Sequence, residues 1–555
     1  MTSATHGPAM NLSQDFSFQG IPYTTGTASA PLLAANLELS FWGGVDQKTG
    51  EVIDRFHPLS GRHLKDTILA IPGSRGSCGG SIIMLELMLG GVGPKALIFE
   101  RPEAIITLGV LVAEEVWNMG VPVIVLKSEE FQELMSWDGK EVHVQGSQVS
   151  NTPILPAAPS AGSGVASDVI EVEKLGVQLS DNDRATLAGA HSKASQISMR
   201  IIIRMAHLMG ATELMSITSA HVDGAWYGPG SLALGQRLRD WGGKFVVPAT
   251  QNSVNYEQRR WRALGVDVES GTACEELAQA FLDMGATKSF TCAPYLLDGA
   301  PKVGDNIAWG ESNAVVYANS VLGARTLKNP NVLECLIALT ARAPRAGVYL
   351  DENRTATLLV KVNEFQDTDD AFWPILGYQI GHVSKAQVPV ITGLENVKPS
   401  RDDLKAFSAA FATSSSAAMF HIVNVTPEAL TLEATCVDPS ALDSVDIEMK
   451  DLEGCWDEFN NGASPREVDL ISLGNPHFSL REIKQLAQLC QGKVKQQGVA
   501  IIITCGRSQH FLASQAGYVE DLERFGVQFL TDTCWCYVQE PVMPQQTKVI
   551  MTNSV

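Results

Sequence analysis

The chain has 555 residues, too many for one hydrophobic core of ordinary size, so its length favours several domains. Apolar residues make up 45% and charged residues 18%, as in globular proteins, and the formal net charge is -20. This negative charge argues against nucleic-acid and anionic-membrane partners. The sequence has no credible membrane span and no basic, apolar start typical of a secretory signal, which predicts a cytoplasmic protein.

Residues 1–150 predict a small α/β domain, because short β-type runs such as TILAI (67–71) and ALIFE (96–100) alternate there with turns and helical segments. Residues 151–172 are rich in proline, alanine, glycine and serine and predict a linker. Residues 173–555 then predict a larger, multi-lobed α/β domain.

The C-terminal part of that domain, at about 440–540, predicts a lobe with a parallel sheet. Three β-branched runs are separated by helical segments at βαβ spacing: VDLISLG (468–474), VAIIIT (499–504) and VQFLTDT (527–533). They are followed by Asn475, Cys505 and Cys534. Because parallel strands place their carboxyl ends on one edge of a sheet, we expect these three residues to converge there.

A third cysteine follows another short β-like run, Cys292 in SFTCAPYLL (289–297). Three thiolates are too few for a closed structural zinc site, but they suit an iron–sulphur cluster with one iron open to substrate. The alternative is that Cys292, Cys505 and Cys534 are small buried apolar side chains, as most intracellular cysteines are. The residues alone leave both interpretations open.

Two segments carry many polar groups within apolar surroundings. Glu311, Ser312 and Asn313 open a helix-like run (307–326), while Ser219 and His221 follow the strand-like LMSI. Buried polar groups are costly unless they are paired with one another or with a ligand. They therefore indicate either a ligand pocket or a polar seam between helices, and a lone histidine is often a satisfied local contact.

The glycine-rich IPGSRGSCGGS (71–81) follows an apolar run and precedes a helical one. It is not a Walker loop, since no lysine follows before Lys95, and its glycines miss the dinucleotide-binding spacing. What remains is Ser77 at a helix N-terminus beside Arg75. A helix N-terminus and a guanidinium both stabilise an alkoxide, so Ser77 is either a general base or part of a plain capped turn.

Taken together, these motifs resemble the aconitase X family over roughly residues 20 to 554. The motifs that carry the resemblance are SFWGGVDQKTGEVIDRFHPLSG, PGSRGSCGGS, SAHVDGAWYG, TCAPY, GDNIAWGESNAVVYANSVLGART, YLDENR, GNPHFSL and DTC. The first two match its small swivelling domain, and the others match its large catalytic domain in the same order. The resemblance implies a hydro-lyase of the aconitase superfamily.

The resemblance also implies roles for individual residues. Ser77 would be the base and Arg75 its support, while Cys292, Cys505 and Cys534 would hold a [2Fe-2S] cluster whose iron acts as a Lewis acid. Archaeal members resemble phosphomevalonate dehydratases and have a cysteine where this chain has Asn475.

The fused domains and the GNPHFS and TCGRS motifs resemble the branch that dehydrates cis-3-hydroxy-L-proline to pyrroline-2-carboxylate. In that branch the small-molecule substrate would contact a pocket set: Ser219, His221, Glu311, Ser312 and Asn313. The alternatives are a dehydratase of another hydroxy acid such as phosphomevalonate, which should need cationic residues, and a non-catalytic relative. The resemblance further implies a tail after Thr-Asn-Ser, whereas this sequence ends at Val555; it leaves the oligomeric state open.

Overall fold

The computed structural model describes residues 15–154, 172–363, 365, 369–460 and 467–554. Most of the predicted linker, 155–171, lies outside this part. The chain divides into two compact units: Met1–Arg75 with Ile83–Asp168, and Gly76–Ile82 with Val169–Val555. The glycine-rich segment around Ser77 is therefore grouped with the larger unit, although the residues on both sides of it belong to the smaller one.

The smaller unit is built on one eight-stranded sheet in which β3, β4, β5 and β6 run parallel and the other strands add antiparallel. In sheet order the strands are β1 (Ser17–Gln19), β8 (Gln148–Ser150), β7 (Glu141–Gln145), β3 (Thr27–Ala34), β4 (Ile68–Ile71), β5 (Ala96–Phe99), β6 (Val123–Val125) and β2 (Ile21–Thr24). Its helices are α2 (Ala104–Trp117), α3 (Ser128–Leu134) and most of α1 (Gly80–Leu89), whose first three residues are grouped with the larger unit. Every residue of β4, β5 and β6 is buried, as expected for central parallel strands covered on both faces.

Among its described residues, the larger unit contains three sheets of parallel strands and one antiparallel pair, β13 with β9. In sheet order the strands are β11 (Ala249–Gln251), β10 (Ser219–Val222) and β12 (Ile307–Trp309); β13 (Arg342–Pro344) and β9 (Leu214–Ser216); β16 (His421–Ile422), β15 (Pro389–Thr392), β14 (Leu358–Val362) and β17 (Ser444–Ile447); and β20 (Val527–Thr531), β19 (Ala500–Cys505), β18 (Leu470–Phe478) and β21 (Ile550–Thr552). Its α-helices are α5 (Asp181–Leu187), α6 (Lys193–Leu208), α7 (Pro229–Asp240), α8 (Val268–Asp283), α9 (Ser312–Tyr317), α10 (Leu333–Ala338), α11 (Phe372–Ser384), α12 (Arg401–Ser414), α13 (Met449–Phe459), α14 (Leu480–Cys490), α15 (Arg507–Gln515) and α16 (Tyr518–Phe525).

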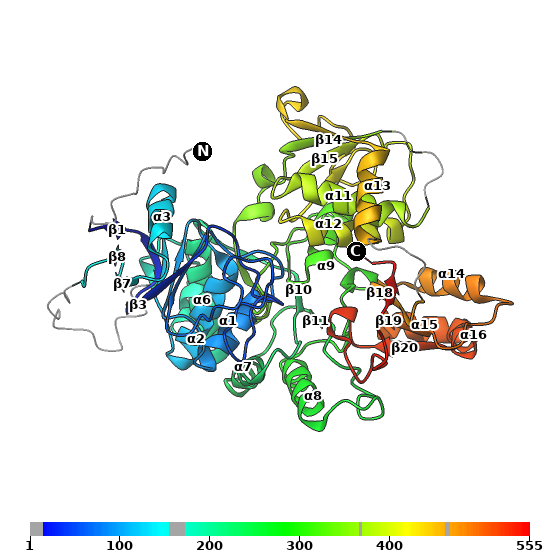
Figure 1. The fold of residues 1–555 in the computed structure, drawn as a ribbon, viewed down its shortest axis with the longest axis horizontal. Coiled ribbons are helices and arrows are strands. Elements are labelled where there is room, and N and C mark those ends of the chain that lie inside the picture. Colours follow the sequence, from blue (N-terminus) through cyan, green and yellow to red (C-terminus); the bar gives the residue numbers. More distant parts are fainter. Residues whose placement is uncertain (1–14, 155–171, 364, 366–368, 461–466, 555) are drawn as a thin grey trace, which may run out of the picture. The chain divides into compact units, whose positions relative to one another are not determined.

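The C-terminal sheet has the predicted parallel order, with β19 between β18 and β20. Helix α14 begins at the predicted capping box, in which Ser479 and Glu482 each accept the other's backbone N–H. Helices α14, α15 and α16 lie together beside these strands in Figure 1. Alternate residues of β19, among them Ile501 and Ile503, pack into one apolar core with these helices.

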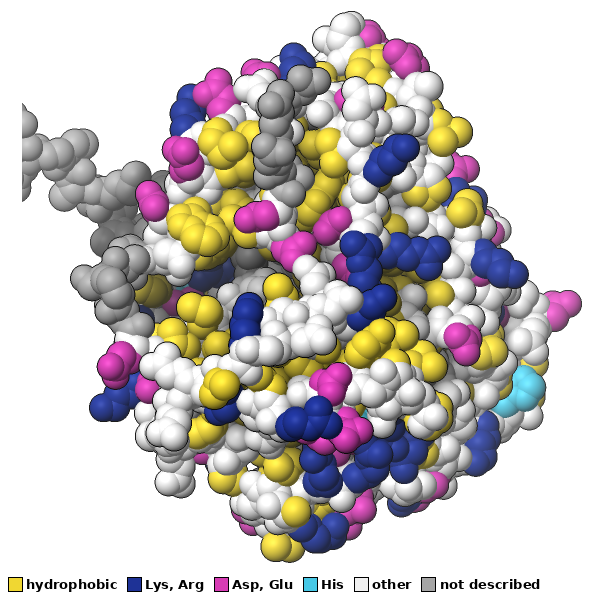
Figure 2. All heavy atoms as spheres, turned by 90° about the vertical axis from the view of Figure 1, so that its right-hand side faces the viewer, with side chains coloured by type: hydrophobic (Ala, Val, Ile, Leu, Met, Phe, Trp, Pro, Cys, Tyr) yellow, Lys and Arg dark blue, Asp and Glu magenta, His cyan; other side chains and the backbone are white. Residues whose placement is uncertain are grey.

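These two units confirm the predicted fold class, a small α/β domain and a large α/β domain with parallel sheets. Within the described residues, no helix is long and apolar enough to cross a membrane. On the face shown in Figure 2, basic and acidic side chains are interspersed with apolar ones. Exposed arginines of the larger unit also pair with acids, for example Arg262 with Glu275 and Arg524 with Glu520.

Candidate active site

The carboxyl ends of β11, β10 and β12 converge on a group of polar side chains. Asp223 follows β10, Asn252 follows β11, and Glu311 stands two residues after β12. The strands are parallel neighbours, so their ends lie on one edge of the sheet, the position where open α/β sheets bind ligands. This edge is the centre of the candidate site.

Glu311 is held by two amides. Its Oε1 accepts a hydrogen bond from Asn313 Nδ2 at 2.9 Å, and its Oε2 accepts one from Asn252 Nδ2 at 3.2 Å. Asn313 in turn donates to the carbonyl of Cys292 at 3.2 Å. Burial, followed by the negative charges of Cys534 and Asp223, raises the pKa of Glu311 to about 7. The predicted pair Glu311 and Asn313 therefore lies beside Cys292.

Asp223 forms a second acidic group on the same edge. Its carboxylate accepts hydrogen bonds from Tyr227 Oη at 2.9 Å and from the side chain of Asn331. Tyr227 Oη also lies 3.2 Å from Tyr537 Oη, in the 3-10 turn that follows Cys534. Burial raises the pKa of Asp223 to about 6. The contacts of Asp223 link the end of β10 to the C-terminal lobe.

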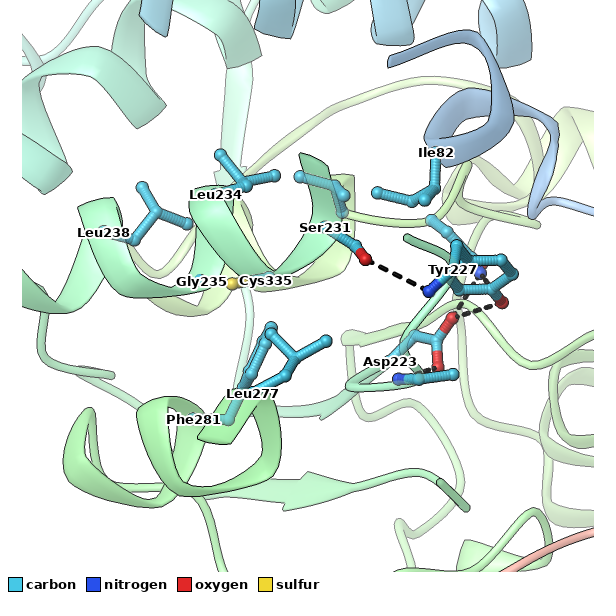
Figure 3. Close-up of a pocket in the computed structure, with 13 residues that line it drawn as sticks. Ile82, Asp223, Tyr227, Ser231, Leu234, Gly235, Leu238, Leu277, Phe281 and Cys335 are labelled. Atoms are coloured by element: carbon cyan, nitrogen blue, oxygen red, sulfur yellow. Dashed lines mark hydrogen bonds between the residues drawn. The ribbon is translucent and has the colours of Figure 1, made fainter. Parts of the chain in front are cut away.

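A small cavity adjoins Asp223 and Tyr227 (Figure 3). Figure 3 shows Asp223 and Tyr227 at one end, and Leu234, Leu238 and Leu277 at the other. The cavity measures about 20 Å³, room for about one water molecule. This volume is too small for a substrate. Apolar side chains of α7 and α8 therefore pack closely behind the sheet edge that carries Asp223.

Glu334 of α10 lies beneath the two acids and is completely buried. Its Oε1 accepts the backbone N–H groups of Asp223 at 3.0 Å and Val332 at 3.3 Å. Its Oε2 has no hydrogen-bond partner among the described residues and faces Gly310, where a Cβ would come within 3.2 Å of it. Burial raises the pKa of Glu334 to about 8, so the group is a neutral acid at neutral pH.

His221 and Ser219 both belong to β10 but differ in position. His221 is buried; its Nδ1 lies 2.8 Å from Thr250 Oγ1, and its Nε2 has no partner within the described part of the chain. Burial lowers the pKa of His221 to about 4, so its ring is neutral. Ser219 starts the strand, at the end opposite Asp223. The structure therefore brings His221 closer than Ser219 to the acidic edge.

Cys534 lies close to Glu311 and contacts two other thiols. Cys292 and Cys536 both contact Cys534 through their side chains, and Cys534 Sγ lies 3.2 Å from Asn475 Oδ1. The hydrogen bonds from Cys292 and Cys536 hold the pKa of the Cys534 thiol well below its usual range. Cys292 and Cys534 are buried, whereas Cys536 is exposed. The expected convergence of Asn475 and Cys534 is present, and Cys536 joins them without having been predicted.

Cys505 is placed differently. It ends β19 as predicted, but its side chain joins Ile501 and Ile503 in the apolar core against α14, α15 and α16. The next residue, Gly506, lies closer to the site, since a Cβ there would be 3.4 Å from Thr291 Oγ1. Among the described residues, no three His, Cys, Asp or Glu side chains are placed to hold a metal ion.

The segment with Ser77 lies in the larger unit and is fixed to the same edge. The carbonyl of Cys78 accepts the Asn331 N–H at 3.1 Å, and Ser81 Oγ donates to the Asn331 carbonyl at 2.7 Å. Cys78 Sγ lies 4.0 Å from Ser312 Oγ. Ser77 Oγ accepts a hydrogen bond from the backbone N–H of Gly79 at 3.2 Å, and Gly79 directly precedes the first residue of α1.

Arg75, predicted to support Ser77, is grouped with the smaller unit. Its guanidinium forms an ion pair with Asp54 at 2.9 Å.

Family models cover the chain in four parts. Residues 17–151 match the aconitase X swivel domain, 176–352 the first domain, 356–457 the second and 468–555 the third. The chain belongs to the aconitase X family. The three thiols therefore come from two domains of the family model: Cys292 from the first, and Cys534 and Cys536 from the third.

Relatives of this aconitase X protein match it over nearly its whole length. A cis-3-hydroxy-L-proline dehydratase of Hypocrea jecorina is 51% identical over 97% of this chain and 90% of its own. A protein of the same name from Pseudomonas aeruginosa is 45% identical over 95% of this chain and 90% of its own. The holo-form structure of Thermococcus kodakaraensis aconitase X aligns with a TM-score of 0.61 and 31% identity, covering 68% of this chain and 93% of that one. The chain is accordingly a dehydratase of the aconitase X family.

Sequence reasoning missed Asp223, Asn331, Glu334 and His477, which the geometry places in or next to the aconitase X site. Asp223 had a signal, because it directly follows a short β-type run, the criterion that singled out Asn475 and Cys534. Glu334 had a weaker one, as an acid in the apolar run VLECLIAL. His477 lay within the quoted GNPHFSL motif but was not singled out, and Asn331 lay in loop sequence without a signal.

Proposed function

We propose that the chain dehydrates cis-3-hydroxy-L-proline to pyrroline-2-carboxylate. The observation that carries this proposal is the meeting, within the larger unit, of the Ser77 segment, the acids Asp223 and Glu311, and the thiols of Cys292 and Cys534. The choice of substrate follows the names of the relatives from Hypocrea jecorina and Pseudomonas aeruginosa.

The charge of the site supports an amino acid as the substrate. The largest charge effects on Glu311 come from Cys534 and Asp223, which are both acidic groups. Such a pocket favours the positively charged ring nitrogen of a hydroxyproline. A phosphorylated hydroxy acid would meet like charge there, which disfavours phosphomevalonate.

The thiol group fits an iron–sulphur cluster in its chemistry. Cys292 and Cys534 are soft sulphur donors in contact with each other; hydrogen bonds favour the thiolate form of Cys534, whereas burial raises the pKa of the Cys292 thiol. We propose these two as ligands, with a third thiolate from Cys505, the prediction by resemblance, or from Cys536, which contacts Cys534. When bound, a [2Fe-2S] cluster would supply Lewis-acid chemistry for loss of a hydroxyl group.

Ser77 is proposed as the base that removes the proton from C2 of the substrate. The N–H of Gly79 and the N-terminus of α1 stabilise negative charge on Ser77 Oγ. Loss of the C2 proton and of the C3 hydroxyl forms the C2–C3 double bond and one water molecule. The resulting enamine tautomerises to pyrroline-2-carboxylate.

The test is turnover of cis-3-hydroxy-L-proline by protein purified without oxygen, followed by mass spectrometry of the product, with iron content measured in the same sample. We expect loss of one water per substrate. Mevalonate 5-phosphate serves as the comparison substrate. Faster dehydration of that compound, or iron-loaded protein without any turnover, would refute the proposal, and the second result would favour a non-catalytic relative. Cys505→Ser and Cys536→Ser, assayed for iron, identify the third ligand.

A further inference from the structure

His477 occupies a central position between the two buried thiols. It lies near the end of β18 and is completely buried. Its backbone N–H points to Cys292 Sγ at 3.4 Å, and its carbonyl accepts a hydrogen bond from the buried Lys405 Nζ at 3.1 Å. The backbone of His477 is therefore fixed on both sides.

The imidazole of His477 is fixed as well. Nε2 lies 2.7 Å from the carbonyl oxygen of Thr533, which can only accept, so Nε2 carries the hydrogen. Nδ1 lies 3.0 Å from Thr291 Oγ1. That hydroxyl accepts the N–H of Ala293 at 3.1 Å and can give its own hydrogen to Nδ1. The neutral Nε2–H tautomer thus satisfies both ring nitrogens.

The two partners of the ring directly precede the two cysteines. Thr291 stands before Cys292, and Thr533 stands before Cys534. The cysteines belong to different domains of the family model, the first and the third. One buried ring therefore bridges two segments that are far apart in the sequence, at the positions next to the sulphur-bearing residues.

We propose that His477 is a positioning residue that sets the separation and orientation of the Cys292 and Cys534 sulphur atoms. The effect of this positioning on metal binding rests on the proposed function, in which the Cys292 and Cys534 thiols hold the cluster. Outer groups that orient ligands govern affinity, because their loss lets the ligands drift from the required geometry. The N–H to Cys292 Sγ adds a hydrogen bond that favours the thiolate.

The experiment separates the two halves of the bridge. In His477→Gln the amide reaches toward Thr533 but loses Thr291, whereas in His477→Asn the shorter amide stays near Thr291 and loses Thr533. Thr291→Val removes the same bond to Nδ1 without changing the histidine. His421 is the matched control, because it is also buried and its Nε2 contacts a carbonyl, that of Arg354, at 2.7 Å.

Two readouts are measured on each variant of the full chain. The first is iron per chain after anaerobic purification and a challenge with a chelator. The second uses metal-free protein and diamide, which takes up two electrons and two protons as the two thiols form a disulfide. Peptide mass spectrometry then measures the rate at which Cys292 and Cys534 become linked. This rate reports the approach of the sulphurs without any cluster.

We expect both His477 variants to hold iron about 10- to 100-fold more weakly than the parent. We also expect them to form the Cys292–Cys534 disulfide more slowly, with Thr291→Val intermediate and His421→Gln unchanged in both readouts. Parent-like iron retention and disulfide rate in the His477 variants would overturn the proposal. If those variants do not fold, parent-like values in Thr291→Val would overturn it. A parent without iron would instead contradict the proposed cluster, while the disulfide rates still decide the role of His477.

Discussion

The buried acid Glu334 gives a stability prediction with a defined sign. Its pKa is raised from 4.5 to about 8, so the folded chain binds this proton more tightly than the unfolded chain. Stability is then lost as pH rises between these two values. The difference corresponds to about 5 kcal/mol once the pH exceeds 8, of which about 3 kcal/mol is already lost at pH 7.

Glu334→Gln isolates this loss because glutamine keeps the shape and an acceptor for the Asp223 and Val332 N–H groups but does not ionise. Urea unfolding of parent and variant at about pH 5 and about pH 9 measures the difference. We expect the free energy of unfolding of the variant, relative to that of the parent, to increase by about 4 kcal/mol between these two pH values. Parallel pH profiles would refute the reasoning. Glu334→Ala, which leaves both N–H groups buried without their acceptor, should be destabilised at every pH.

Three further predictions concern the site. Ser77→Ala should lower kcat by about 100-fold or more while the visible absorption of the proposed cluster remains, and loss of that absorption would contradict the proposal that Ser77 is the base. Cys292→Ser should lose iron, whereas Cys436→Ser, a buried thiol that interacts with the Leu432 carbonyl, should retain it. Asp223 is ionised above its pKa of about 6. The proposed substrate is a zwitterion with a cationic ring nitrogen, so kcat/KM should rise with pH through that value. Asp223→Asn should abolish the rise, and the same rise in this variant would contradict the prediction.

The alternation of apolar runs with helical spacing was enough to predict the parallel C-terminal sheet. The strand-end rule then predicted that Asn475 and Cys534 would approach each other, and the contact of 3.2 Å between them bears this out. The same rule located Cys505 at its strand end but could not give the direction of its thiol. That direction follows from the pleat, since Cys505 shares a face with Ile501 and Ile503.

The rest of the site depends on long-range packing that has no local signal. Glu334 belongs to a short apolar helix, α10, and reaches the strand ends because Val332 adopts a left-handed backbone with φ of 88° just before it. A β-branched residue rarely takes this conformation, so sequence preference argues against the turn that the structure contains. His477 likewise acquires its four partners from three separate segments, none of them adjacent to it in the sequence.

The contact between Asn475 and Cys534 also bears on how the site can change during evolution. The amide oxygen of Asn475 already occupies a place next to the Cys534 sulphur. A cysteine at position 475 would exchange an oxygen donor for a sulphur donor at nearly the same point, without any rearrangement of the strands. A single side-chain change at position 475 would therefore alter the atom that lies beside the Cys534 sulphur while the order of the strands stays the same.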